Sequence, residues 1–165
     1  MTSEHLLHTI PPIYDRNSKI LILGSFPSVK SREVSFYYGH PQNRFWRVLA
    51  AVLGCAVPSS NEEKTDLLHS HNIALWDIIK SCDIVGSSDS SIKNVVPNDI
   101  GTILSSCGIR QIYSNGKTSE KLFNKYIKDT VGRDTVALPS TSPANASYNL
   151  ERLTDSWSVI KNNIR

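Results

Sequence analysis

The residues best suited to chemistry lie between Gly24 and Trp46, in the segment GSFPSVKSREVSFYYGHPQNRFW. Aromatic rings, an asparagine amide, a histidine and several serine hydroxyls alternate there with glycines and prolines. Aromatic faces can stack on a flat heteroaromatic ring, an amide can read its edge, and hydroxyls with backbone N–H groups can hold phosphates. The segment therefore indicates a pocket for such a ring, although burial in the core would explain the crowding of Phe36, Tyr37 and Tyr38 equally well.

A nucleophilic mechanism is the first alternative for this segment. Ser25 and Ser28 follow an apolar run, and His40 and Asp77 could complete a triad with one of them. The sequence lacks the G-x-S-x-G elbow that presents such a serine, and Pro27 disfavours a helix where that elbow would begin one. The pattern therefore does not favour a serine hydrolase.

Metal and nucleotide-cofactor motifs are also missing from the sequence. His69 and His71 are two residues apart on a predicted helix, so they face different directions. The three cysteines are too far apart for a CxxC metal site or a disulfide framework. Neither a P-loop nor a dinucleotide-binding glycine motif occurs.

The hydrophobic pattern alternates between short apolar runs and amphipathic stretches. Strands are expected at residues 19–23, 73–76, 110–114 and 134–138, and helices at 43–53, 61–71, 97–107, 117–128 and 150–164. Asn61 is the expected N-cap of the second of these helices. This alternation predicts an α/β fold, a parallel sheet covered by helices on both faces in a three-layer α/β/α sandwich. The loops that leave the strands at 24–42, 115–116 and 139–146 should then meet at one edge of the sheet.

The chain of 165 residues fits one domain, residues 1–165, with residues 1–18 as a lead-in to which we assign no chemistry. The polar segment at 86–91 must lie on the surface or against a polar ligand, and a solvated loop is expected for most of it. The net charge of +3 is only mildly basic, and the lysines at 117, 121, 125 and 128 are more typical of a solvated helix face than of a nucleic-acid contact. No apolar run approaches the ~20 residues that cross a bilayer. We therefore expect no membrane association, and a monomeric, cytoplasmic protein.

Three motifs, in this order, resemble those of the uracil-DNA glycosylase superfamily, and most closely its branch of hypoxanthine-DNA glycosylases. They are GSFPS at 24–28, YYGHPQNRFW at 37–46 and PSTSPANA at 139–146. The resemblance implies an α/β/α fold with a four-stranded parallel sheet and no cofactor. It also implies DNA containing a deaminated base as the partner, and hydrolysis of the N-glycosidic bond of that base, most closely hypoxanthine.

The resemblance also implies roles for individual residues. In mismatch-specific relatives an asparagine of the first motif positions the attacking water, but Phe26 stands there in this chain. The catalytic role then falls on Asn43, whose side-chain carbonyl would orient the water. Tyr38 occupies the place of the base-stacking aromatic, and Asn115 lies in the loop that faces the base edge.

Further binding roles follow from the same resemblance. The backbone N–H groups of Ser25 and Phe26 would stabilise the departing base. The expected phosphate-binding residues are Ser28, Ser140, Ser142 and Lys117. The third motif lacks the histidine with which classical relatives stabilise a uracil anion, which argues against strong uracil excision. A uracil or thymine mismatch glycosylase, or a non-catalytic binder of damaged DNA, remain as alternatives.

Overall fold

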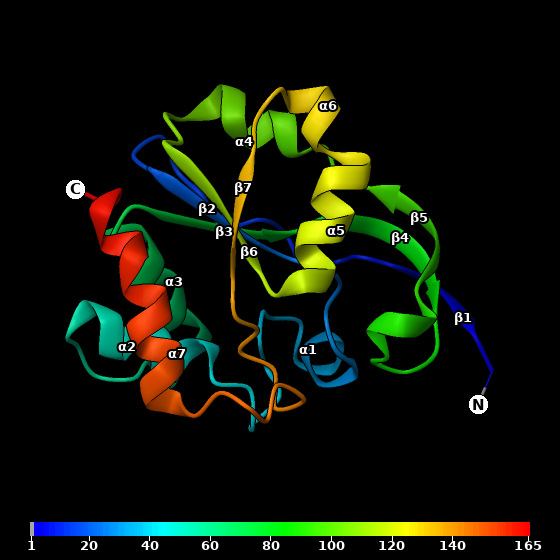
Figure 1. Cartoon of the computed structure of the whole chain (residues 1–165), viewed down its shortest axis with the longest axis horizontal. Helices are drawn as coiled ribbons and strands as arrows, with labels where there is room; N and C mark the ends of the chain where they lie inside the picture. The colour runs from blue at the N-terminus through cyan, green and yellow to red at the C-terminus, as the bar shows by residue number, and fades with distance from the viewer. Residues whose placement is uncertain (1) are drawn as a thin grey trace.

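The computed structural model describes residues 2–165, and its centre is a parallel sheet with strand order β3-β2-β6-β7 (Figure 1). The strands are β2 (Ile20–Gly24), β3 (Ile73–Asp77), β6 (Gln111–Asn115) and β7 (Thr135–Leu138). β2 and β3 are almost entirely buried, as expected for parallel strands covered on both faces. The predicted four-stranded sheet is therefore confirmed.

Helices cover both faces of this sheet (Figure 1). One layer contains α2 (Phe45–Leu53), α3 (Asn61–Ser70), α7 (Leu150–Trp157) and the 3₁₀ helix η2 (Ser158–Asn162). The other contains α4 (Ile100–Ser106), α5 (Lys117–Tyr126) and α6 (Lys128–Val131). Within β2, Ile20 and Ile22 pack into the first layer, whereas Leu21 and Leu23 pack into the second. This alternation of side chains produces two cores and confirms the α/β/α sandwich.

The helix ends are fixed by local hydrogen bonds that the sequence only partly reveals. Ser60, and not Asn61 as expected, caps α3, because its hydroxyl accepts a hydrogen bond from the Glu63 N–H at 3.0 Å. In α7 the buried Trp157 donates its indole N–H to the carbonyl of Pro139 at 2.9 Å. That bond anchors the loop that follows β7. None of the helices in residues 2–165 is both long and apolar enough to cross a bilayer.

A second, three-stranded antiparallel sheet was not predicted. It has the order β1-β4-β5, with β1 (Glu4–Leu7), β4 (Ile79–Ile84) and β5 (Lys93–Pro97). β4 begins two residues after β3 ends, so the chain passes directly from one sheet to the other. The expected lead-in at residues 1–18 thus contains β1, a strand of this second sheet that the sequence did not predict. The mostly exposed β1 carries too weak an apolar pattern to be recognised in the sequence.

Candidate active site

A pocket of about 390 Å³ lies at the carboxyl ends of the parallel strands, within the size range of small-molecule sites. Loops that follow β2, β6 and β7 converge there, as expected for an open α/β sheet. Every residue expected to bind or act on a ligand lines this pocket, with the exception of Lys117. The lining residues from that set are Ser25, Phe26, Ser28, Tyr38, Asn43, Asn115, Ser140 and Ser142.

Asn43 sits at the entrance to α2, and its side-chain oxygen is fully engaged. This oxygen accepts hydrogen bonds from the Phe45 N–H and from the Thr141 hydroxyl, both at 2.9 Å. The first bond occupies a backbone donor at the start of the helix, and the second reaches across to the loop after β7. The side chain is thus held in one orientation, and its NH₂ group has no hydrogen-bond partner within residues 2–165.

Thr141 connects Asn43 to Asn115 on the opposite side of the pocket. Its backbone N–H donates to the Asn115 side-chain oxygen at 3.1 Å, and its hydroxyl accepts from the Asn115 NH₂ group at 3.1 Å. The fully buried Thr141 therefore positions two of the expected site residues together. Sequence reasoning selected the two neighbouring serines instead, because nothing in the sequence indicates which hydroxyl of the third motif faces inward.

Replacing Thr141 with valine tests this connection. The isosteric change removes the hydroxyl that joins both amides, and we expect it to lower the free energy of unfolding by about 1–3 kcal/mol. Turnover should fall by about 10-fold or more, because the two amides lose their common partner. Thr141→Ser keeps the hydroxyl and is the matched control. Urea unfolding and single-turnover cleavage measure the two effects, and a valine variant as stable and active as the serine variant would contradict them.

Arg44 holds the loop after β7 against the start of α2. Its backbone N–H donates to the Thr141 carbonyl at 3.0 Å, and its guanidinium donates to the carbonyls of Ser142, Asn145 and Tyr148. A guanidinium has five N–H donors in a fixed plane, so one side chain can order several carbonyls of an irregular loop. Arg44 was not singled out from the sequence, where it is only the residue after Asn43.

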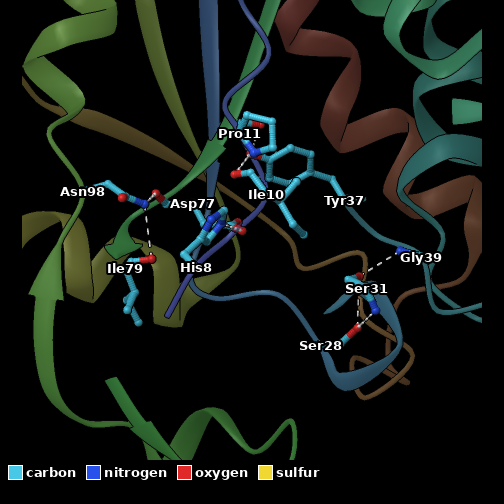
Figure 2. Close-up of polar contacts among 10 residues, drawn as sticks. All are labelled: His8, Ile10, Pro11, Ser28, Ser31, Tyr37, Gly39, Asp77, Ile79 and Asn98. Carbon is cyan, nitrogen blue, oxygen red and sulfur yellow. Dashed lines mark hydrogen bonds and ion pairs between the residues drawn. The ribbon is translucent and has the colours of Figure 1, made fainter. Parts of the chain in front are cut away.

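The three crowded aromatic residues have different roles. Tyr37 is buried, and its hydroxyl donates to the carbonyl of Pro11 at 2.8 Å, so it belongs to the core (Figure 2). Phe36 stacks on Trp46. Tyr38 lines the pocket, and its ring stacks on Phe45 with the centroids 4.1 Å apart. One face of the Tyr38 ring is therefore already covered by protein.

Tyr38 has two further features that are unusual for a core tyrosine. Its backbone has a φ of 53°, a left-handed conformation that costs free energy in a bulky residue. Its buried hydroxyl has no hydrogen-bond partner within residues 2–165. Burial raises the pKa of this phenol far above its ordinary value, the nearby Asp77 carboxylate raises it further, and Asn115 offsets only part of the rise. The hydroxyl therefore stays protonated and can donate a hydrogen bond to a ligand.

The expected phosphate-binding serines make local hydrogen bonds. Ser28 caps the short helix α1 (Val29–Val34) by accepting from the Ser31 N–H at 3.2 Å (Figure 2). Ser140 and Ser142 accept from the backbone N–H groups two residues further on, which leaves their own protons free to donate. Lys117 is exposed at the start of α5 and is not part of the pocket lining.

The segment at 86–91 is not simply a solvated loop, as was expected. Ser87 and Asp89 line the pocket. Ser25 donates its hydroxyl proton to the Asp89 carboxylate at 3.4 Å, and the Ser87 hydroxyl accepts from the Val29 N–H at 2.9 Å. The segment is therefore bonded to the first motif and forms one wall of the site.

Asp77, at the end of β3, also lines the pocket, and its partner is His8 from the N-terminal segment. The His8 Nε2 atom lies 2.8 Å from Asp77 Oδ2, and the two side chains are only 2% and 6% exposed (Figure 2). His40 and Asp77 were considered together only for a serine triad that the sequence does not favour, and in the structure Asp77 pairs with His8. This pair could not be found from the sequence, because His8 directly follows β1 of the second sheet, Asp77 ends β3 of the first, and the two residues are 69 positions apart.

Comparisons with known proteins identify the family of the chain. The family model of the uracil DNA glycosylase superfamily matches residues 11–162. A hypoxanthine DNA glycosylase from Methanosarcina barkeri is 35% identical over 137 residues, which cover 82% of this chain and 85% of the relative. One from Methanosarcina acetivorans is 33% identical over 152 residues, covering 91% and 94%.

A solved structure has the same fold. It is a solution NMR structure of a candidate uracil DNA glycosylase from Methanosarcina acetivorans, which superimposes with a TM-score of 0.79 at 32% identity. The superposition covers 93% of this chain and 95% of the other. The match of the family model to nearly the whole chain, together with relatives above 30% identity, shows that this chain belongs to the uracil DNA glycosylase superfamily.

Proposed function

We propose that the protein is a monofunctional DNA glycosylase that hydrolyses the N-glycosidic bond of deaminated bases, chiefly hypoxanthine in deoxyinosine. The observation that carries this proposal is the convergence of the three motifs on one pocket with an aromatic wall and a polar edge. Two relatives that are 35% and 33% identical to this chain are named hypoxanthine DNA glycosylases. We propose no cofactor, and we expect the enzyme to act as a monomer in the cytoplasm.

The proposed reaction begins with extrusion of the base from the duplex, which costs a few kcal/mol and least at a weakened pair. The base enters beside Tyr38, with Asn115 facing its edge. As the bond between C1′ and N9 lengthens, electrons move onto the base and the sugar becomes oxocarbenium-like. The backbone N–H groups of Ser25 and Phe26 stabilise this charge. Water then adds to C1′ and its proton passes to the base, which leaves an abasic site.

Asn43 is the proposed catalytic residue, because it lines the pocket and is rigidly held. An amide is too weak a base to remove a proton from water, so its contribution is to orient the water at C1′. Both lone pairs of its oxygen are already used by Phe45 and Thr141. Water must therefore displace the Thr141 hydroxyl or be held by the free NH₂ group.

Binding of the surrounding DNA is assigned to hydroxyls and charge near the pocket rim. Ser140 and Ser142 have hydroxyl protons that can donate to phosphate oxygens flanking the lesion. The Ser28 hydroxyl donates to Ser31 Oγ at 3.1 Å and would exchange that bond for one to a phosphate. Lys117 is exposed outside the pocket lining, where a phosphate further along the strand could pair with it. These contacts hold the duplex in register and carry no information on the base.

A panel of duplexes tests the proposed activity. Each duplex carries a single deoxyinosine, deoxyuridine or deoxyxanthosine, and alkali cleaves the strand at any abasic site formed. We expect strand breaks first and fastest at deoxyinosine. No lysine is proposed as a nucleophile, so borohydride should trap no covalent protein–DNA adduct, and a trapped adduct would indicate a lyase instead.

The same assay separates the alternatives once a duplex with a thymine mismatch is added to the panel. Faster cleavage at deoxyuridine or at a thymine mismatch would favour the uracil reading, which the solved neighbour's description supports. Tight capture of inosine-containing DNA without any product would favour a non-catalytic binder. That reading is motivated by Phe26, an apolar residue in the place where mismatch-specific relatives have a catalytic asparagine.

A further inference from the structure

We propose that Asp77, held in place by His8, recognises the ring N–H that deamination creates on a base. This inference rests on the proposed function, because it names the group that would select the substrate of that pocket. Asp77 would be a base-recognition residue, and His8 a positioning residue that acts through it. The N-terminal segment would then be a functional part of the site.

The buried Asp77 carboxylate needs a hydrogen-bond partner. Asp77 is 6% exposed, and the only hydrogen bond that its carboxylate makes within residues 2–165 is the one to His8. Moving a charge out of water costs several kcal/mol unless a partner offsets the cost. His8 is itself enclosed, with its ring against those of Phe26 and Tyr37. His8 and Asp77 therefore form a buried pair, of which Asp77 lines the pocket.

One oxygen of the Asp77 carboxylate remains free on the pocket side. Oδ2 bonds to His8, whereas Oδ1 lies where a side chain on Gly24 would be, only 2.4 Å from an ideal Cβ at that position. Gly24 leaves this space open, and the unpartnered Tyr38 hydroxyl lies beside it. A strong acceptor and a strong donor thus stand next to each other in one pocket.

Hydrogen bonds fix the main chain at Asp77. The Asn98 NH₂ group donates to the carbonyls of Asp77 at 2.9 Å and Ile79 at 3.2 Å (Figure 2). The Ile78 N–H donates to the carbonyl of Gly24 at 2.9 Å. The carboxylate is therefore presented from a rigid segment at the junction of the two sheets, as selective recognition requires.

The Asp77 carboxylate, an acceptor, and the Tyr38 hydroxyl, a donor, match a ring N–H beside a carbonyl, which is the lactam group of a deaminated base. Deamination converts the exocyclic amine of adenine into a carbonyl and places a proton on N1, and the same change in cytosine places one on N3. A carboxylate accepts a hydrogen bond from such a ring N–H, and the Tyr38 hydroxyl can donate to the adjacent carbonyl. The lone pair at N1 of adenine would instead face the carboxylate, and both would be left unpaired.

The negative charge of the Asp77 carboxylate opposes the negative charge that builds on the departing base, because like charges repel. Asp77 is therefore expected to act on binding and selectivity and to contribute little to bond cleavage. A change at Asp77 or His8 should appear mainly in affinity and in the choice of base. This separates the proposed role from that of Asn43.

The experiment measures binding without depending on turnover. Duplexes carry the 2′-fluoro-arabino forms of deoxyinosine or deoxynebularine, because the fluorine destabilises an oxocarbenium ion and suppresses cleavage. Nebularine has a lone pair at N1 and no bulky substituent. We expect the wild-type protein to bind the inosine duplex more tightly, and Asp77→Asn to reduce the ratio of the two affinities by about 10- to 100-fold, since a charged hydrogen bond is replaced by a neutral amide that can face either ring.

Variants of His8 test the positioning role. His8→Ala should reduce the affinity ratio in the same direction as Asp77→Asn, and His8→Gln should restore part of it, because the glutamine NH₂ group can replace the Nε2 donor. The control is His5→Ala, which removes a similar pair with Asp83 on the exposed side of β1 and should leave the ratio unchanged. Thermal unfolding verifies that each variant is folded.

The possible outcomes distinguish this inference from the proposed function. An unchanged affinity ratio in folded Asp77→Asn would overturn the role of Asp77. Equal ratios in His8→Ala and wild type would overturn that of His8. If the ratio shifts as expected while the wild-type protein releases no base from ordinary inosine duplexes, recognition stands and the proposed catalytic function fails.

Discussion

Replacing Asn43 with alanine is expected to lower the single-turnover rate of inosine excision by about 100-fold or more. The variant loses the group that is held between α2 and the Thr141 loop and that would orient the attacking water. It also loses a hydrogen bond at the start of α2, which should lower the free energy of unfolding by about 1 kcal/mol. Excision assays with enzyme in excess over the duplex, and urea unfolding, measure the two effects separately.

Asn43→Asp is the matched variant for this residue. A carboxylate still accepts hydrogen bonds from Phe45 and Thr141, so stability should be close to wild type, but it has no NH₂ group to donate. If water is oriented by an acceptor, this variant keeps much of the activity; if the NH₂ group holds it, activity is lost as in the alanine variant. Wild-type activity in Asn43→Ala would refute the catalytic role altogether.

Gly24→Ala is expected to abolish most of the activity while the fold survives. The new Cβ would lie 2.4 Å from Asp77 Oδ1 and 3.0 Å from the Tyr38 hydroxyl oxygen, so both groups must move. Neither can move cheaply, because Asp77 is bonded to His8 and the Tyr38 ring is stacked on Phe45. We expect a loss of about 1–3 kcal/mol in stability. At limiting duplex the excision rate should fall by about 100-fold, because the displaced groups no longer bind the base.

Gly108→Ala is the control for that substitution. A Cβ at Gly108 meets no atom within 4 Å, so this change should affect neither stability nor excision by a large factor. Both variants are compared by thermal unfolding and by cleavage of the inosine duplex. A Gly24→Ala protein that cleaves as fast as Gly108→Ala would mean that the space beside Asp77 is not used in the reaction.

The arrangement of the main sheet was predictable because its signals are local. The apolar runs that form β2, β3, β6 and β7 predict the ends of these strands to within one residue. The cap of α3 was placed one residue too late, at Asn61, because Ser60 and Asn61 are both good caps and only the hydrogen bond to Glu63 decides between them.

The second sheet was missed for a physical reason. β1 exposes most of its side chains, and β5 does so as well, so neither produces an apolar run. Such strands are defined by pairing with β4. For β1 this partner lies far along the chain, since His5 pairs with Asp83. The pairing of His8 with Asp77 could not be predicted either, because it depends on the pairing of β1 with β4.

The sequence by itself determined the family motifs, the α/β alternation and several of the residues that line the pocket, since each depends on residue type and spacing along the chain. Only the tertiary structure decided how these residues are connected. Thr141 joins Asn43 to Asn115, Arg44 orders the last loop, and His8 partners Asp77. These are hydrogen bonds between segments far apart in the sequence, and their partners are chosen by burial and by the absence of water, which no local pattern records.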